Sequence, residues 1–122
     1  MPRHDLDHLE IQLVSTLEGC QVLCLKGFVT AKNTPALQDA IQQVRGQDTI
    51  LDLTEVPYMD SSGLGALLNG YVGSQKHGGQ FALAGVAPRV RELLQITKIE
   101  PLFRIYRTVE EAARALVKNP KA

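Results

Sequence analysis

The sequence is short of several features that mark common classes of protein. It contains no tryptophan, and its 13 basic residues are balanced by 13 acidic ones. A nucleic-acid-binding domain usually carries a basic stripe, so this balance argues against a direct nucleic-acid partner. No apolar run approaches the roughly 20 residues of a membrane-spanning helix, and residues 1–5 lack the apolar segment of a signal peptide. We therefore expect no membrane insertion and a cytoplasmic location.

Cysteine and histidine are also scarce, with two and three residues respectively. Cys20 and Cys24 fall on one predicted strand, where four residues span about 13 Å, which is too far for a disulfide between them. Their spacing is not that of a zinc or thioredoxin-type motif, so we expect two small, buried, apolar side chains. His4 and His8 are spaced to share a metal only if their segment is helical. We predict no metal and no cofactor.

The remaining composition is that of one folded domain. The 122 residues are 44% hydrophobic, which suffices for a packed core. We predict a single domain over residues 1–122, with its core at about 8–117. Apolar and polar residues alternate over 9–13, which predicts a half-exposed strand, whereas the continuous apolar run at 22–25 predicts a more central one. A turn between them lets these two strands form an antiparallel hairpin.

Helical and strand patterns alternate after the hairpin. Strands that single helices separate mostly run parallel. We therefore predict an α/β fold, a mixed sheet of four to five strands with a leading antiparallel hairpin and then parallel strands, packed with about four α-helices. The predicted segments are a helix from Thr34 as cap to Gly46, a strand at 50–53, a helix from Ser61 or Ser62 to about His77, a strand at 81–84, a helix from Pro88, a strand at 103–105, and a helix with a Thr108 and Glu111 capping box that ends at Asn119 and Pro120.

The predicted helix after residue 60 combines an apolar stripe with many small residues. Each glycine in a helix interior costs about 1 kcal/mol relative to alanine. Small residues allow close approach either of a partner protein or of a neighbouring element of the same domain, and both interpretations remain open. The predicted buried stripe consists of Leu64, Leu67, Leu68, Tyr71 and Val72. On the other side Gly65, Asn69 and Gly73 recur every four residues, with Gly70 and Ser74 beside them.

The start of this helix offers two interpretations. Asp60, Ser61 and Ser62 are all good cap residues, so the simplest one is a well-capped helix. The other is a phosphoryl acceptor, because the unpaired N–H groups of a helix start can hold a phosphate. A phosphate on Ser61 would add about −1.5 to −2 charges next to Asp60. That charge would repel an acidic partner from the face of the helix.

The run from Asp60 to Leu64 resembles the phosphorylation segment of the bacterial anti-sigma factor antagonists, which are STAS domains. In that family the serine directly after the aspartate is phosphorylated, so the resemblance implies that Ser61 is the acceptor. It extends over nearly the whole chain. Further matches are Gly27 at the end of the second strand, residues 51–53 as the third strand, and Gly78, Gly79, Ala87 and Pro88 in the turns around the fourth.

The resemblance implies a binding switch. The unphosphorylated protein binds an anti-sigma factor that is also a serine protein kinase, and a sigma factor is released. The kinase uses its own ATP to phosphorylate Ser61, the complex dissociates, and a phosphatase resets the system. The protein would thus regulate transcription by partner switching.

The residues predicted to bind the partner lie around Ser61 and along the following helix. In the family an acidic residue often stands three places after the glycine of the second strand, where this chain has Thr30, and Phe28 replaces a commonly polar residue. The partner surface is therefore expected to differ from the usual one. The predicted set is Thr30, Lys32, Asp60, Ser62, Gly65, Asn69 and Gly73, with Thr30 and Lys32 beside Ser61 because both segments follow strand ends.

An enzyme and a scaffold are the two alternative classes of function. A serine hydrolase elbow needs glycine two places before its serine, but Met59 precedes Ser61 and Asp60 precedes Ser62 in this way. A dinucleotide loop would need a third glycine where Leu68 stands, and no Walker A pattern occurs. We therefore expect no enzyme. A scaffold in a stress-signalling assembly, or a subunit of a lipid-transport ATPase, uses the same domain type and remains an alternative.

Overall fold

The computed structural model describes residues 8–118, which form a five-stranded mixed sheet with the order β1-β2-β3-β4-β5. The first two strands are antiparallel, and each later strand is parallel to its neighbour. The predicted hairpin followed by parallel strands is therefore confirmed. The strands are β1 (Glu10–Ser15), β2 (Gln21–Lys26), β3 (Thr49–Glu55), β4 (Phe81–Ala84) and β5 (Arg104–Tyr106).

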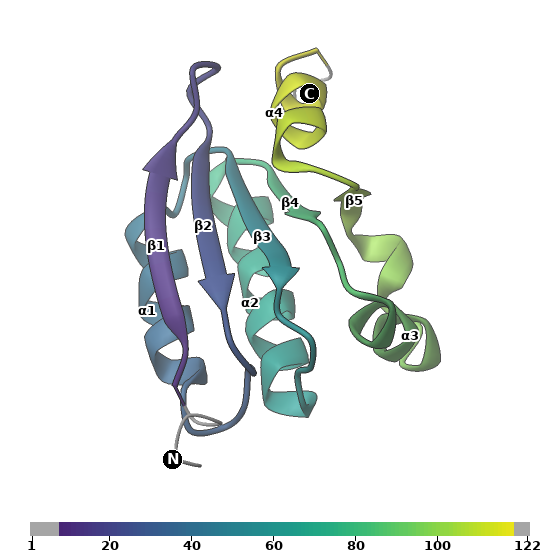
Figure 1. Ribbon diagram of the computed structural model, residues 1–122. Coiled ribbons are helices and arrows are strands. Elements are labelled where there is room, and N and C mark those ends of the chain that lie inside the picture. Colours follow the sequence, from purple (N-terminus) through teal and green to yellow (C-terminus); the bar gives the residue numbers. More distant parts are fainter. Residues whose placement is uncertain (1–7, 119–122) are drawn as a thin grey trace.

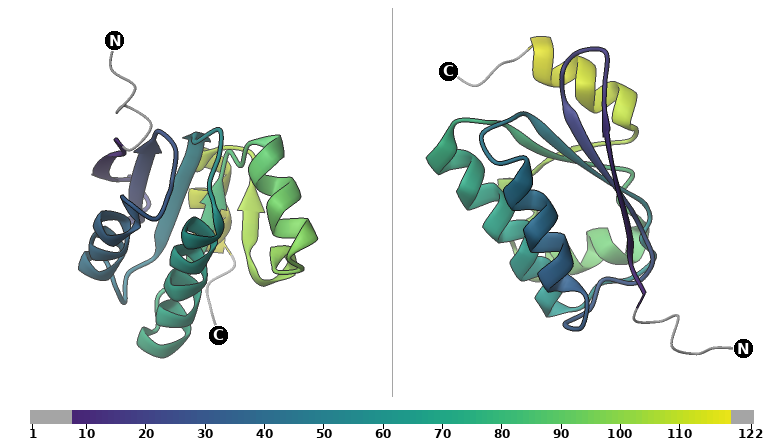
Figure 2. Two further views of the ribbon diagram at one scale, coloured as in Figure 1. Left: turned by 90° about the horizontal axis from the view of Figure 1, so that it is seen from below. Right: turned by 90° about the vertical axis from the view of Figure 1, so that its left-hand side faces the viewer.

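Four α-helices cover the two faces of this sheet. Helices α1 and α2 lie behind β1, β2 and β3 in Figure 1, and α3 packs on the same core. Helix α4 packs on the opposite face, and Figure 2 shows the layers from two further directions. The helices are α1 (Thr34–Gln43), α2 (Ser61–His77), α3 (Pro88–Ile96) and α4 (Val109–Lys118), with a short 3₁₀ turn η2 (Glu100–Leu102) between α3 and β5.

The central strands are mainly apolar because both of their faces are buried, and the half-buried Asp52 is the exception in the middle of β3. Leu23 and Leu51 point toward α1 and α2, whereas their neighbours Val22 and Ile50 point toward α4. Successive strand residues face opposite sides, so a strand between two helix layers favours a continuous apolar run, as in the fully buried β4. Because β2 and β3 are parallel, their ends lie together at the edge of the sheet from which the chain leads into α1 and α2.

Three local predictions need correction. The N-cap of α1 is Asn33 and not Thr34, which is the first helical residue. At α4, Thr108 Oγ1 accepts from the N–H of Glu111, but the Glu111 carboxylate reaches the N–H of Arg107 instead of that of Thr108, so only half of the capping box forms. Cys20 precedes β2 and is not part of it, although it is buried as expected.

The prediction of two buried cysteines holds only in part. Cys24 is half-buried, and burial raises the pKa of both thiols, which makes them poorer nucleophiles at neutral pH. His4, which could share a metal with His8 only in a helix, and the predicted helix end at Asn119 and Pro120 lie outside the described residues.

Candidate functional site

The site is built from two loops that follow neighbouring parallel strands. The loop after β2 lies along the loop after β3, and Val29 and Met59 form a parallel bridge between them. The Val29 N–H donates to the Tyr58 carbonyl (3.1 Å), and the Asp60 N–H donates to the Val29 carbonyl (3.0 Å). These bonds fix Asp60, the residue before α2, against the loop that leads into α1.

The Asp60 carboxylate binds three backbone N–H groups, two in the first turn of α2 and one in the loop after β2. Its Oδ1 accepts from Ser62 (2.9 Å) and Gly63 (3.2 Å), and its Oδ2 accepts from Ala31 (3.2 Å). Asp60 thus caps α2 and ties it to the loop after β2 at the same time. The expectation that the helix start offers free N–H groups to a phosphate is wrong for Ser62 and Gly63, since Asp60 occupies both.

Ser61 is the first residue of α2 and is exposed. The residues around it are fixed in place: Asp60 by its hydrogen bonds and Gly63 by close packing. A Cβ on Gly63 would approach Met59 Cβ to 2.9 Å and Val29 Cγ1 to 3.0 Å, so the first turn of α2 packs directly on the bridge between the loops. The Ser61 side chain is therefore presented to solvent by a rigid first turn.

Ser61 also lines a cleft of about 290 Å³ between the start of α2 and α3. One wall is apolar and includes Leu64 and Ile96, while α3 contributes the charged residues Arg89 and Glu92. No motif marked these α3 residues, because only the packing of α3 beside α2 brings them to Ser61. The one available signal was their position in the first turn and a half of a helix that follows a strand end.

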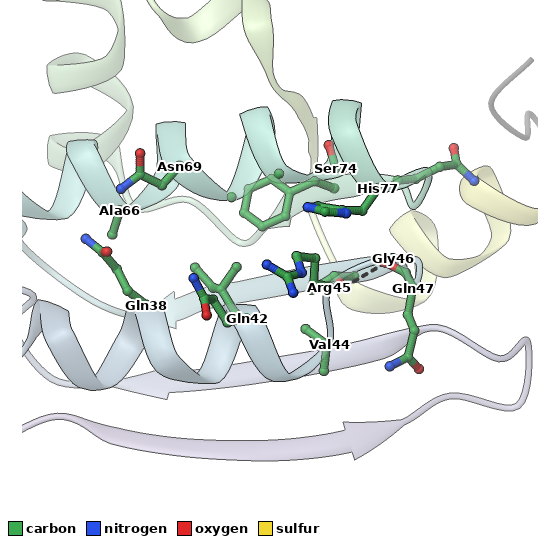
Figure 3. A pocket seen from close by; sticks show the side chains of 16 residues that line it. Gln38, Gln42, Val44, Arg45, Gly46, Gln47, Ala66, Asn69, Ser74 and His77 are labelled. Atoms are coloured by element: carbon green, nitrogen blue, oxygen red, sulfur yellow. Dashed lines mark hydrogen bonds between the residues drawn. The ribbon is translucent and has the colours of Figure 1, made fainter.

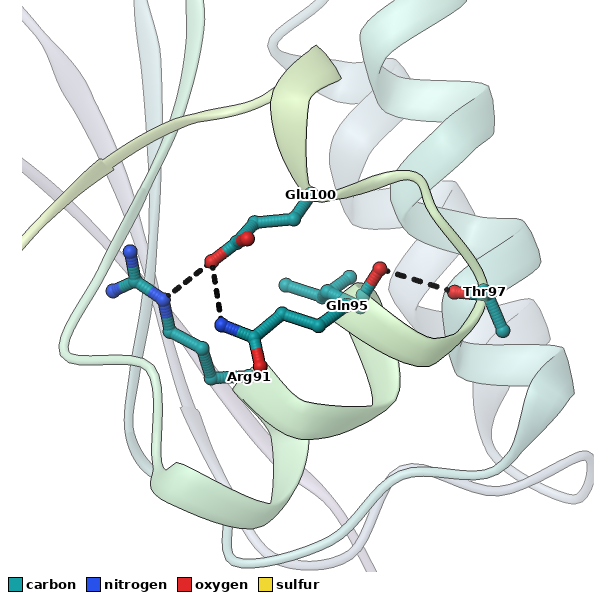
Figure 4. A network of polar contacts seen from close by, with 5 residues as sticks. Arg91, Gln95, Thr97 and Glu100 are labelled. Atoms are coloured by element: carbon teal, nitrogen blue, oxygen red, sulfur yellow. Dashed lines mark hydrogen bonds and ion pairs between the residues drawn. The ribbon is translucent and has the colours of Figure 1, made fainter.

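The nearby arginine of α3 has a different role. Arg91 Nε donates to Glu100 Oε2 (2.7 Å), and Gln95 Nε2 donates to the same oxygen (3.3 Å), as Figure 4 shows. The hydrogen bond from Arg91 lowers the pKa of the Glu100 carboxyl. This network joins α3 to η2. In residues 8–118, Arg89 has no such partner and is available to the cleft.

The small residues of α2 separate into two groups that the sequence did not distinguish. A Cβ on Gly70 would come within 2.5 Å of Phe81 Cζ, whereas one on Gly65 or Gly73 would meet nothing within 4 Å. Ser74 is buried, and Val72 is 46% exposed. The predicted buried stripe is therefore wrong at Val72, because Gly70 and Ser74 take the inward positions and let α2 lie close to the sheet.

The predicted partner-binding residues lie in two places. Thr30 and Lys32 are in the loop that Asp60 binds, and Thr30 Oγ1 accepts from the Lys32 N–H (3.3 Å). Asn33 closes this loop by accepting from the Thr30 N–H (3.0 Å) and donating to the Phe28 carbonyl (2.9 Å). Ser62 and Gly65 lie within about one turn of Ser61 along α2. Asn69 and Gly73 lie farther along and face α1, and Gly73 is about 18 Å from Ser61 by helical rise.

The described residues offer no metal centre and no membrane span. Among residues 8–118, no three histidine, cysteine, aspartate or glutamate side chains cluster in a way that suits a metal ion. No helix in this range is long and apolar enough to cross a bilayer.

Residues 13–112 match the family model of the STAS domain. The chain belongs to the STAS domain family. The chain is similar to the anti-sigma-B factor antagonist of Listeria monocytogenes, which is 27% identical over 104 residues, covering 83% of this chain and 81% of that protein. The suspected family is thereby confirmed.

Solved STAS structures share the fold. An anti-sigma factor antagonist from Mycobacterium paratuberculosis superposes with a TM-score of 0.80 at 24% identity, covering 93% of this chain and 97% of that one. The Bacillus antagonist SpoIIAA in its unphosphorylated form gives a TM-score of 0.74 at 23% identity, with 92% and 100% covered. SpoIIAA has also been solved in its phosphorylated form. At these identities the likeness establishes the fold.

Proposed function

We propose that this chain is an anti-sigma factor antagonist whose binding to its partner is switched by phosphorylation of Ser61. The observation that carries the proposal is the exposed Ser61 hydroxyl on a first turn fixed by Asp60 and Gly63. The similarity to relatives that are named anti-sigma factor antagonists supports the antagonist role. The existence of SpoIIAA in both phosphorylation states supports the switch.

The unphosphorylated face suits close contact with another protein. Thr30 and Lys32 flank Ala31, whose N–H binds the Asp60 carboxylate next to Ser61, and Ser62 and Gly65 continue the surface along α2. Gly65 lets a partner approach the helix backbone because its position is open. The partner is an anti-sigma factor that is also a serine protein kinase, and Asp60, Asn69 and Gly73 complete the contact.

Phosphorylation would make this face repulsive. A phosphoserine carries about −1.5 to −2 charges, beside the carboxylates of Asp60 and Glu92. The N–H groups of Ser62 and Gly63 already bind Asp60, so they cannot draw the phosphate inward. Arg89 offsets part of the repulsion. A hundredfold loss of affinity needs only about 2.8 kcal/mol, which an unfavourable, desolvated phosphate at an interface can supply.

The chain acts as a substrate in this cycle and not as a catalyst. The kinase brings ATP, and a phosphatase removes the phosphate and restores binding. A cycle of this kind takes place in the cytoplasm, where the sigma factor is regulated through the kinase. Thr30, which replaces the family's frequent acidic residue, adapts the surface to a kinase of correspondingly different charge.

Mass spectrometry after incubation with the anti-sigma factor kinase of the same organism and ATP tests the acceptor. The wild type and Ser62→Ala should each gain one phosphoryl group, and Ser61→Ala should gain none.

Isothermal titration calorimetry with the same kinase tests the switch. Ser61→Ala should bind like the wild type, and Ser61→Asp should bind at least about tenfold more weakly, equivalent to about 1.4 kcal/mol. Wild-type affinity of Ser61→Asp would contradict the switch, and isolation of a stable complex with a transport ATPase would favour the alternative role.

A further inference from the structure

A second hollow lies between α1 and α2, toward the end of α2 that is far from Ser61. Its volume is about 170 Å³. Figure 3 shows Arg45 and His77 extending into it, with Gln38, Gln42 and Asn69 lining it farther along the helices. A cavity of about 150 Å³ is known to hold one benzene molecule. This hollow therefore has room for one small ring or a short aliphatic chain.

Two glycines shape the hollow. Gly70 allows the Phe81 ring to lie against the backbone of α2, since a Cβ there would come within 2.5 Å of Phe81 Cζ. Gly73 faces open space on the same side. Ile41 and Val44 complete an apolar wall with the Phe81 ring. The packing of α2 on the sheet thus accounts for Gly70, but it does not account for the space at Gly73.

The charge of the hollow has one sign. None of the residues that line it is acidic. Within residues 8–118 the side chains of Arg45 and His77 have no hydrogen-bond or ion-pair partner. Asp48, the nearest carboxylate along the chain, accepts instead from the backbone and side-chain nitrogens of Gln80. An unpaired guanidinium beside an apolar wall is complementary to a carboxylate with an apolar body.

We propose that the α1–α2 hollow binds a small organic monocarboxylate, with its carboxylate on Arg45 and His77 and its apolar body against Phe81. The carbonyl groups that end α1 also attract the Arg45 guanidinium, so the anion competes with them and binds with an affinity of about 0.1 to 10 mM. This binding does not depend on Ser61 or on a docked protein. The site shares Asn69 and Gly73 with the predicted partner surface, which places a bound anion beside that surface.

Titration of the ¹⁵N-labelled full chain with benzoate at neutral pH, followed by NMR, tests the proposal. Saturable shifts are expected for the amides of Arg45, Gly73 and His77, and none at Ser61. Arg45→Gln should weaken binding at least about tenfold, and Gly73→Leu should abolish it by filling the space. The matched control is Arg114→Gln, which removes an equally exposed arginine from α4 and should leave the affinity unchanged.

Two further probes separate the charge from the apolar body. Benzamide, which has the same ring without the charge, should bind at least about tenfold more weakly than benzoate, and inorganic phosphate should also bind more weakly. Equal binding of benzamide would overturn the role of Arg45 and His77. Equal binding of phosphate would overturn the apolar half of the site. The absence of shifts at the hollow up to about 50 mM benzoate would overturn the proposal as a whole.

Discussion

Two pairs of glycines on α2 have the same intrinsic cost and different surroundings. Gly63 and Gly70 are buried, and a Cβ at either would collide with a neighbouring side chain. Gly65 and Gly73 are open, and nothing in the described fold requires them to be small. Each glycine lowers helix stability by about 1 kcal/mol relative to alanine. Packing explains the cost at the first pair, whereas at the second pair the cost points to contacts made with other molecules.

The same helix also differs between its two ends. At the Ser61 end the backbone is closed by Asp60, which leaves one exposed hydroxyl on a rigid turn. At the His77 end the helix borders a hollow that contains the unpaired guanidinium of Arg45. An exposed hydroxyl beside a cleft suits a covalent switch that a second protein can contact, and a hollow with an unpaired guanidinium suits a small ligand. One helix can therefore carry two kinds of chemical input.

The largest expected effect is that of a side chain placed on the buried pair, Gly63 and Gly70. Gly70→Val should destabilise the protein by about 3 kcal/mol, because the added atoms would overlap the buried Phe81 ring, which itself packs near Phe103. Urea unfolding followed by circular dichroism measures this. Gly73→Val is the matched control on the outward face and should change stability by less than about 1 kcal/mol. Similar losses for the two variants would remove the distinction between the pairs.

Removal of the cap should have the next largest effect. Asp60→Ala leaves the N–H groups of Ala31 and Ser62 without their acceptor, whereas the Gly63 N–H keeps its bond to the Asp60 backbone carbonyl, and we expect a loss of about 2 kcal/mol. Asp60→Asn keeps one acceptor oxygen and should lose about half as much. Denaturant unfolding gives the stability, and hydrogen exchange should show faster exchange at Ala31 in both variants. An unchanged Ala31 rate would show that Asp60 does not hold the two loops together.

Alanine at the open pair, Gly65 and Gly73, should raise the stability of the chain instead of lowering it. Gly65→Ala and Gly73→Ala should each stabilise the isolated chain by up to about 1 kcal/mol, since both positions are open. Gly65→Ala should nevertheless weaken binding to the anti-sigma factor kinase, measured by calorimetry beside thermal unfolding. Greater stability with undiminished binding would mean that Gly65 does not lie in the interface.

The smallest expected effect is at the two serines. Ser61→Ala and Ser62→Ala should each change the free energy of unfolding by less than about 0.5 kcal/mol, because Asp60 and not a serine supplies the cap. Thermal unfolding of both variants checks this. A larger loss for Ser61→Ala would give its hydroxyl a structural role and complicate its use as a phosphorylation test.

Most of the secondary structure follows from local patterns. The predicted helix from Ser61 to His77 and the strand at 81–84 have the observed bounds, because a sharp start signal and a glycine pair limit the first, and a short apolar run forms the second. The hydrophobic period failed at Val72, since it cannot tell which inward positions a sheet fills with glycine or serine. The cap of α1 was misplaced by one residue because Asn33 and Thr34 are both good cap residues, and only the bonds of Asn33 to the loop decide between them.

The order of elements, the parallel strands and the position of Ser61 at a helix start were determined by the sequence alone, because each depends on residues close together along the chain. The tertiary structure decided which glycines are covered, that Asp60 also binds the Ala31 N–H of the other loop, and that Arg89 and Arg45 border two different hollows. The covered glycines depend on the loops and on β4 packed against α2, and the hollows depend on how α1 and α3 lie beside it. The period of one helix defines its faces, but the neighbours that cover those faces come from distant parts of the chain.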